Sequence, residues 1–204
     1  MLDRLPATEA ELEAVFLRAS VNTFYPKATV RCPDDAVFRT QLARDLACLL
    51  DVDDTVVAWS TLCFGLRVDG RIYVPDFVVT YESGRTEFLD AVELTDDPAV
   101  TEAFACVQRR HRYVPRLAIE EGWRLQNAKD LLRYARHRIS LNDRVRLLAA
   151  LDETGSLTVA ECFHLFRETQ PMSGISWMVL NRFLSMDLDA APIGPETLIR
   201  RFVR

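Results

Sequence analysis

Two acidic residues on neighbouring predicted strands have the clearest potential for chemistry in this chain. Asp76 stands inside the apolar run Ile72–Thr80, and Glu93 lies at the end of the next such run, Phe88–Leu94. The side-chain period of two in a strand aims Asp76 at one face, where a buried carboxylate needs a partner or a metal. Hard cations prefer oxygen ligands and keep positions open for water and substrate, so this pair is typical of a nuclease site for Mg²⁺. The structural alternative is that Pro-Asp only marks the entry to a strand.

The order of these segments resembles the PD-(D/E)XK nuclease superfamily and, within it, the TnsA-type family, the endonuclease subunit of heteromeric transposases. In that family a Pro-Asp-Phe strand precedes an apolar strand with Glu-x-Lys, and this chain has Tyr73-Val-Pro-Asp-Phe-Val-Val79 followed by Ala91-Val-Glu-Leu-Thr95. Residues 38–57 are similar to its first long helix and acidic turn, and Glu121-Gly-Trp-Arg-Leu-Gln126 is similar to its Gly-aromatic strand. The resemblance covers roughly residues 35–135 and implies an α/β fold, a restriction-endonuclease-like mixed sheet flanked by helices.

Two positions of the family's catalytic pattern are changed in this chain. Asp76 matches the central metal-binding Asp and Glu93 matches the acid of Glu-x-Lys, so the resemblance implies that these two residues hold Mg²⁺. The Lys position is occupied by Thr95, which has no charge to stabilise negative charge developing on phosphate. The position of the helical Glu falls on or near Ala43.

Other residues could supply the missing groups. Asp45 could be the substitute acid, although two residues along a helix turn a side chain about 200° away. Lys129 could replace the missing Lys from the helix after the 124–126 strand, but it also fits a solvated position in the first turn of that helix. In a shifted register Asp90 or Glu87 would be the second acid, and no Lys would follow either of them.

Composition indicates a globular protein and excludes few functions. The 204 residues are 49% hydrophobic with a mean hydropathy of −0.01, and the net charge of −5 argues against a protein that coats nucleic acid. No run approaches the roughly 18 apolar residues of a membrane helix, and the N-terminus lacks a signal-peptide profile, so we expect a cytoplasmic protein without a membrane partner. The five scattered cysteines are expected to be free thiols.

Periodicity predicts a meander of strands between helices. A helix over 8–20 has the capping box Thr8 and Glu11, strands are expected over 55–59, 62–68, 71–81 and 86–94, and Asp69-Gly70 predicts a hairpin turn. A helix over 97–117, with Pro98 in its first turn, would end in a basic cluster. That cluster would complement the helix dipole or, in the functional alternative, contact phosphate through Arg109, Arg110 and Arg112.

A change in pattern near Ser140 predicts two domains, 1–140 with the nuclease-like core and 141–204 with a helical, winged-helix-like fold. Helices over 142–151, 158–169 and 173–185 would precede a two-stranded wing over 188–203. The third helix would enter the major groove, although its apolar composition also fits packing against another surface. The candidate DNA-binding residues besides the basic cluster are Arg124, Ser173, Ser176, Asn181 and Arg182.

The resemblance implies Mg²⁺-dependent cleavage of DNA at transposon ends, with a transposase and an AAA ATPase regulator as partners. Because two catalytic positions are changed, the alternative is a degenerate nuclease fold that binds DNA or acts as a scaffold to recruit such partners. An unrelated α/β protein with an accidental Pro-Asp motif is the third interpretation.

Overall fold

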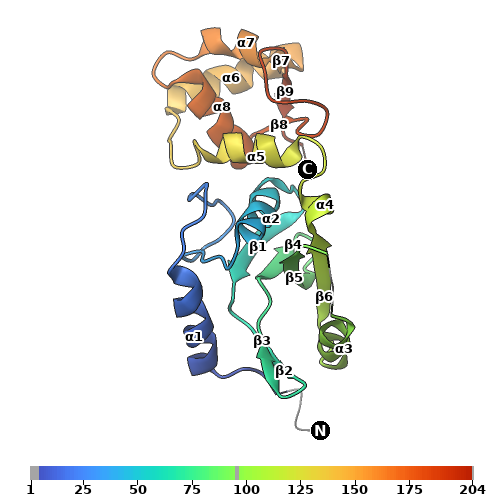
Figure 1. Ribbon diagram of the computed structural model, residues 1–204. Helices are drawn as coiled ribbons and strands as arrows, with labels where there is room; N and C mark the ends of the chain where they lie inside the picture. The colour runs from blue at the N-terminus through green and yellow to red at the C-terminus, as the bar shows by residue number, and fades with distance from the viewer. Residues whose placement is uncertain (1–4, 95–96, 204) are drawn as a thin grey trace. The chain divides into compact units, whose positions relative to one another are not determined.

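The computed structural model describes residues 5–94 and 97–203 and divides the chain into two compact units after Glu120 (Figure 1). The sequence analysis placed the boundary after Ser140. The difference arises because residues 124–132 form one helix that packs with the C-terminal helices, whereas the sequence analysis expected a strand ending at Gln126 and a short helix after it, both in the first unit. Within the described part of the chain, no helix combines the length and apolar character needed to cross a bilayer.

The first unit contains a four-stranded mixed sheet in the order β1-β4-β5-β6. The strands are β1 (Val56–Thr61), β4 (Phe77–Tyr81), β5 (Thr86–Val92) and β6 (Arg110–Pro115). Neighbours β1 and β4 are antiparallel, as are β4 and β5, whereas β5 and β6 are parallel. The mixed α/β class expected from the sequence is therefore confirmed for this unit.

The predicted strand over 71–81 is two strands that belong to different sheets. Its first part, β3 (Arg71–Tyr73), pairs only with β2 (Leu66–Val68), and its second part is β4. The turn between β2 and β3 is Asp69-Gly70, as predicted, and both residues have the positive φ that a tight hairpin turn requires. Pro75 lies between β3 and β4, in keeping with the exclusion of proline from central ladders.

In its described residues the first unit also contains the helices α1 (Glu9–Ser20), α2 (Gln41–Val52), α3 (Pro98–Cys106) and α4 (Arg116–Ile119). The predicted capping box of α1 is confirmed, since the Thr8 amide donates to Glu11 Oε2 at 2.8 Å. Helix α2 lies against β1 and β5 and is buried along most of its length. An aromatic contact between Trp59 of β1 and Phe77 of β4, 5.7 Å between ring centroids, fills the adjoining core.

The helix predicted over 97–117 is wrong beyond Cys106. Asp97 caps α3 with Pro98 in the first turn as expected, but Gln108 takes a left-handed φ of 57° and the chain continues as β6. Parallel pairing with β5 overrides the local helical pattern. The basic cluster therefore lies in a turn and on an edge strand, and complementing a helix dipole does not explain it.

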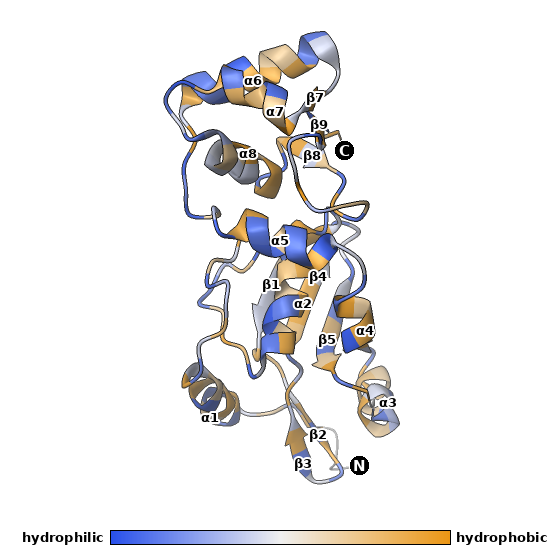
Figure 2. Cartoon of the chain, turned by 45° about the horizontal axis from the view of Figure 1, so that its top comes forward, coloured by the Kyte–Doolittle hydropathy of each residue, from blue (hydrophilic) through white to orange (hydrophobic). Residues whose placement is uncertain are grey.

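The second unit packs helices against a small antiparallel sheet in the order β7-β9-β8. Its helices are α5 (Arg124–Leu132), α6 (Leu141–Thr154), α7 (Val159–Cys162) and α8 (Pro171–Leu180), with the 3-10 turn η1 (Phe163–Leu165). Its strands are β7 (Leu157–Thr158), β8 (Leu184–Met186) and β9 (Leu198–Arg201). Hydrophilic and hydrophobic residues alternate along α6 (Figure 2), which contributes Leu147 and Leu151 to the core of this unit.

Helix α8 is enclosed within this unit. None of its residues is exposed, and α5 packs against it. Asn127 of α5 fixes this arrangement because its amide donates to the carbonyls of Leu188 and Ala191 at 2.8 Å and accepts from the Ile193 amide at 2.9 Å. The helix that the sequence analysis placed in a DNA groove is therefore a core helix.

A fully buried carboxylate, Asp143, holds the segment that precedes α8. It accepts hydrogen bonds from the amides of Arg167, Glu168 and Thr169 at 2.7–3.0 Å and pairs with Arg146 at 2.7 Å. Burial acts to raise the pKa of Asp143, but these donors outweigh it and hold the pKa well below its usual range. The folded state therefore contains an ionised buried carboxylate.

We expect Asp143→Asn to lower the free energy of unfolding by about 3 kcal/mol at neutral pH, because a neutral amide cannot accept from all these donors. The pKa of Asp143 is depressed in the folded state. The wild-type carboxylate therefore gives its full stabilisation of the fold above about pH 4, and this stabilisation is lost as the pH falls through the folded pKa. Urea denaturation at several pH values should show the two proteins converging below about pH 4.

The matched control is Asp152→Asn, which removes an exposed carboxylate paired with Arg201 at 3.1 Å. Its cost should stay below about 1 kcal/mol. Equal losses in the two variants would contradict a special role for Asp143.

Candidate functional site

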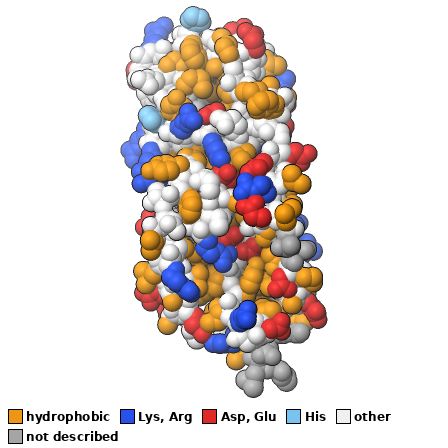
Figure 3. All heavy atoms as spheres, in the orientation of Figure 1, with side chains coloured by type: hydrophobic (Ala, Val, Ile, Leu, Met, Phe, Trp, Pro, Cys, Tyr) orange, Lys and Arg blue, Asp and Glu red, His pale blue; other side chains and the backbone are white. Residues whose placement is uncertain are grey.

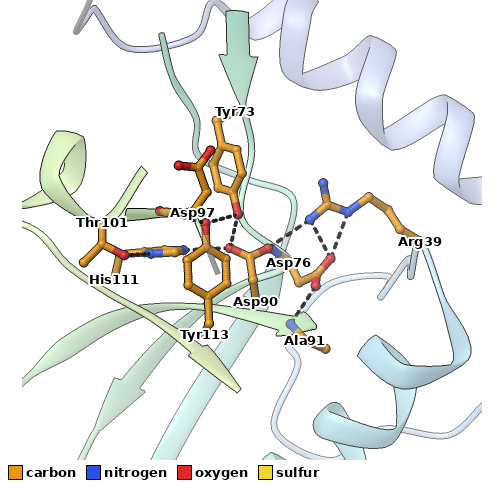
Figure 4. Close-up of polar contacts among 9 residues, drawn as sticks. All are labelled: Arg39, Tyr73, Asp76, Asp90, Ala91, Asp97, Thr101, His111 and Tyr113. Atoms are coloured by element: carbon orange, nitrogen blue, oxygen red, sulfur yellow. Dashed lines mark hydrogen bonds and ion pairs between the residues drawn. The ribbon is translucent and has the colours of Figure 1, made fainter. Parts of the chain in front are cut away.

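Two buried carboxylates, Asp76 and Asp90, lie opposite each other on neighbouring strands (Figure 4). Phe77 pairs with Leu89 across β4 and β5, so Asp76, one residue before β4, lies opposite Asp90 in β5. The Asp76 amide donates to Asp90 Oδ1 at 2.9 Å, and the Ala91 amide donates to Asp76 Oδ2 at 3.0 Å. The backbone of each strand thus holds the carboxylate of the other.

The guanidinium of Arg39 lies between the two carboxylates. Its Nε and Nη2 donate to Asp76 Oδ1 at 2.8 and 2.6 Å, and Nη2 also donates to Asp90 Oδ1 at 3.1 Å. Arg39 comes from the turn before α2, and its side chain is 37% exposed, against 8% for Asp76 and 5% for Asp90. A single cation at the surface therefore neutralises part of a buried pair of like charges.

Burial and charge oppose each other at this pair. Burial raises the pKa of Asp76, the Arg39 guanidinium lowers it, and the neighbouring Asp90 charge raises it again, with a net increase above the usual value. Burial would lower the pKa of Arg39, but the charges of Asp76 and Asp90 hold it above its usual value. The guanidinium stays charged and is the main counterion of the pair.

The second oxygen of Asp90 is held by aromatic residues from other elements. Tyr73 donates its hydroxyl to Asp90 Oδ2 at 2.8 Å, and His111 Nε2 lies 2.7 Å from the same oxygen. Thr101 Oγ1 of α3 lies 3.3 Å from His111 Nδ1, and the hydroxyl oxygens of Tyr73 and Tyr113 lie 3.3 Å apart. Burial and the Asp90 charge raise the pKa of Tyr73, which keeps its hydroxyl a neutral donor. Each oxygen of Asp90 thereby has two neighbours that can donate to it.

In this arrangement the pair does not fit a divalent cation. Mg²⁺ needs free carboxylate lone pairs at close range, whereas both oxygens of Asp90 and Oδ1 of Asp76 are occupied by donors. Within the ranges that the structure describes, no group of three or more His, Cys, Asp or Glu residues is arranged to hold a metal. A cation could join Asp76 and Asp90 only after Arg39 moved away.

Glu93, the second acid expected from the sequence, lies apart from this network. It follows the end of β5, its side chain is 64% exposed, and Arg116 Nε and Nη2 bind it at 2.5 Å each. Hydrogen bonding to Arg116 lowers the pKa of Glu93. The structure therefore gives Asp90 the position opposite Asp76 that the sequence analysis assigned to Glu93.

The hairpin register contains the signal that points to Asp90. Thr80 pairs with Thr86 in an antiparallel hairpin, so Asp76, which precedes Thr80, and Asp90, which follows Thr86 by the same number of residues, face each other. The residue two positions after Asp90 is Val92, which cannot supply the charge of the family's Lys. Thr95, the expected Lys position, lies outside the described residues.

The proposed substitutes for the changed positions lie in two different units. Ala43, at the position of the missing helical Glu, is buried in α2. Asp45, the possible substitute acid, is buried in the same helix and accepts from Gln41 Nε2 at 2.6 Å. Lys129 lies in α5 of the second unit. The side chains that do bind the carboxylate pair, Arg39, Tyr73 and His111, were not identified from the sequence, because their elements meet only in the folded sheet.

The predicted DNA-binding residues fall into distinct environments. The basic cluster of the first unit, Arg109, Arg110 and Arg112, is exposed in the turn before β6 and on β6 itself. In the second unit, Arg124 forms a bidentate ion pair with Asp189 at 2.8 and 2.9 Å.

The two serines of α8 are wrong as DNA contacts because both are buried, and Ser173 donates to the Gln170 carbonyl at 2.8 Å. Asn181, just after α8, is exposed and donates to the Trp177 carbonyl, and the half-buried Arg182 follows it. Direct base contact by α8 is therefore not available in this arrangement.

Comparisons with known protein families and with curated proteins find no match to this chain. The geometry of the site is therefore the guide to function. It consists of two facing carboxylates on adjacent strands, neutralised by an arginine and held by a tyrosine and a histidine.

We expect Arg39→Gln to lower the free energy of unfolding by about 2 to 4 kcal/mol at pH 7, because it leaves two buried like charges without their counterion. This range allows for the partial exposure of Arg39. Without Arg39 the folded pKa of Asp76, which is already raised, should rise further, so the stabilisation is present below about pH 4 and is lost as the pH rises through the raised pKa. The deficit relative to wild type, measured by urea denaturation, should grow from pH 4 to pH 7.

Arg116→Gln is the control, since it breaks an exposed pair with Glu93 and should cost below about 1 kcal/mol with little dependence on pH. A deficit in Arg39→Gln that stayed constant across this pH range would show that Arg39 does not act as counterion to the buried pair.

Proposed function

We propose that this chain is a catalytically degenerate PD-(D/E)XK-like protein that binds DNA and serves as a scaffold for a transposase-type partner. The observation that carries this proposal is the Arg39 guanidinium between Asp76 and Asp90. In the nuclease group that the sequence resembles, the corresponding pair of acids holds Mg²⁺. Here a permanent cation of the chain performs the electrostatic part of that role.

A guanidinium can replace the charge of a metal ion but not its chemistry. It presents fixed donors and has no open coordination position where water could be bound and activated. The family's Lys is expected two positions after the second acid, where Asp90 is followed by Val92. The family's helical Glu is expected at Ala43, so the site lacks both charged groups. These features support retention of the fold without cleavage.

The order of elements in the second unit supports a winged-helix-like fold. Helix α6 leads through β7 to α7 and α8, and β8 and β9 follow, with β9 between β7 and β8 in the sheet. Because α8 is enclosed, this unit is better suited to backbone contacts and to partner binding than to sequence recognition by that helix. A transposase and an AAA ATPase regulator are the partners implied by the family resemblance.

A second candidate function, Mg²⁺-dependent endonuclease activity, is favoured by the position of Arg39. Its side chain is 37% exposed and comes from a turn, so it can leave the pair without unfolding the sheet. A partner or DNA phosphate that attracted Arg39 would leave Asp76 and Asp90 facing each other without their cation.

The two candidates are separated by incubating the protein with supercoiled and end-labelled DNA in Mg²⁺ or Mn²⁺, alone and with a candidate transposase. For the scaffold we expect DNA retardation without cleavage, and equal retardation by Asp76→Asn. Isothermal titration with Mn²⁺ should detect binding to Arg39→Gln but not to wild type, because the substitution frees the lone pairs of Asp76 Oδ1 and Asp90 Oδ1 that Arg39 occupies.

Asp76→Asn combined with Arg39→Gln is the control for this titration and should abolish the new Mn²⁺ binding. Metal-dependent nicking by wild type that Asp76→Asn abolishes would replace the scaffold with the endonuclease. A protein that neither retards nor cleaves DNA would contradict both candidates.

A further inference from the structure

Charge is divided unequally between the two units. Residues 121–204 contain 12 Lys and Arg against 10 Asp and Glu, a formal charge of +2, whereas residues 1–120 contain 13 against 20, a formal charge of −7. The acidic total of the chain therefore hides a mildly basic C-terminal unit. An electrostatic contact with a polyanion is more favourable on that unit than on the first.

The positive charge of this unit is concentrated in one short segment, with a formal charge of +3, that runs from the last turns of α5 towards α6. Between residues 129 and 138 there are four cations, Lys129, Arg133, Arg136 and Arg138, and one acid, Asp130. The Arg133 side chain is 68% exposed, and Arg136 and Arg138 are also exposed, with His137 between them. Figure 3 shows Lys and Arg side chains gathered at the edge of this unit where the segment joins α5 to α6 in Figure 1.

Local structure explains only part of this clustering. A cation in the last turn of a helix complements the helix dipole, which accounts for Lys129 and for Arg133 at the C-cap. Arg136 and Arg138 lie beyond the helix, where that effect is lost. Asp130, the one acid within residues 129–138, lies 3.4 Å from Arg133 and also accepts from Gln126. The segment retains a net positive charge at the surface.

The basic segment follows directly after α5, the helix that packs against α8. With α8 covered, a contact of this unit with DNA has to use another exposed surface, and the 129–138 segment is the part where exposed arginines concentrate. Arginine forks match phosphate oxygens, and phosphate contacts position a protein on DNA without reading its sequence.

We infer that Arg133, Arg136 and Arg138 form a binding surface for the phosphate backbone of duplex DNA. This inference rests on the proposed DNA-binding function and names the surface that performs it. The three arginines lie within six residues, a span of at most about 20 Å. This is shorter than one turn of duplex DNA, about 34 Å, so they can contact neighbouring phosphates together.

The test compares the full-length protein with Arg133→Gln/Arg136→Gln/Arg138→Gln by fluorescence anisotropy on a labelled duplex at several salt concentrations. Removing one arginine that neutralises a phosphate should reduce the slope of log K against log salt by about 0.9, so the triple variant should reduce it by about 2.7. The corresponding decrease in affinity should be on the order of a hundredfold or more at about 50 mM salt. Unlabelled duplexes of unrelated sequence should compete equally.

The control is Arg109→Gln/Arg110→Gln/Arg112→Gln, which removes the same charge from the basic cluster of the first unit. It should change the salt slope by less than the first variant does. Thermal unfolding should show that both variants keep the wild-type fold, since all six side chains are exposed.

Two results would overturn this inference with different consequences. If wild type binds DNA and the 133–138 variant binds it equally, or if only the 109–112 control loses affinity, the surface is wrong and the proposed DNA binding stands. If wild type binds no duplex at any salt concentration, the proposed DNA-binding function fails together with the surface.

Discussion

Two carboxylates that face each other in a buried position form the constraint on which the first unit depends. Asp76 and Asp90 lie opposite each other across β4 and β5, and two uncompensated negative charges there would oppose folding. Arg39 supplies the counterion, while Tyr73 and His111 supply further donors. These partners come from the turn before α2, from β3 and from β6, so the electrostatic requirement ties distant segments to the centre of the sheet.

A metal ion and a guanidinium are two solutions to this electrostatic requirement, with different consequences for chemistry. A divalent cation would place an open, reactive coordination sphere between the strands, whereas Arg39 fills that space with directed hydrogen bonds. A satisfied polar network of this kind is rigid and specifies one geometry. The same residues therefore support folding in this chain while leaving no evident place for an activated water.

The sequence predicted the features that local residues determine. The capping box at Thr8 and the turn at Asp69-Gly70 need only neighbours along the chain, and both are confirmed. The second acid depended on strand register, which the hairpin sets, so the apolar run ending at Glu93 pointed to the wrong carboxylate. The strand β6 could not be predicted locally, because parallel pairing with a distant strand decides it.

The boundary between the units illustrates how packing can change the function expected of a helix. Residues 121–126 were expected to form a strand of the nuclease-like core that leads into a short helix, but the buried face with Leu125, Ala128 and Leu131 belongs to a single helix that packs against α8. The packing of α5 against α8 leaves no residue of α8 exposed, and the chain after the C-terminal end of α5 forms the exposed basic segment 133–138. If the proposed DNA binding holds, this segment would contact phosphates, which position a protein on DNA without reading its sequence, and any sequence preference would come from a partner or from the shape of the DNA.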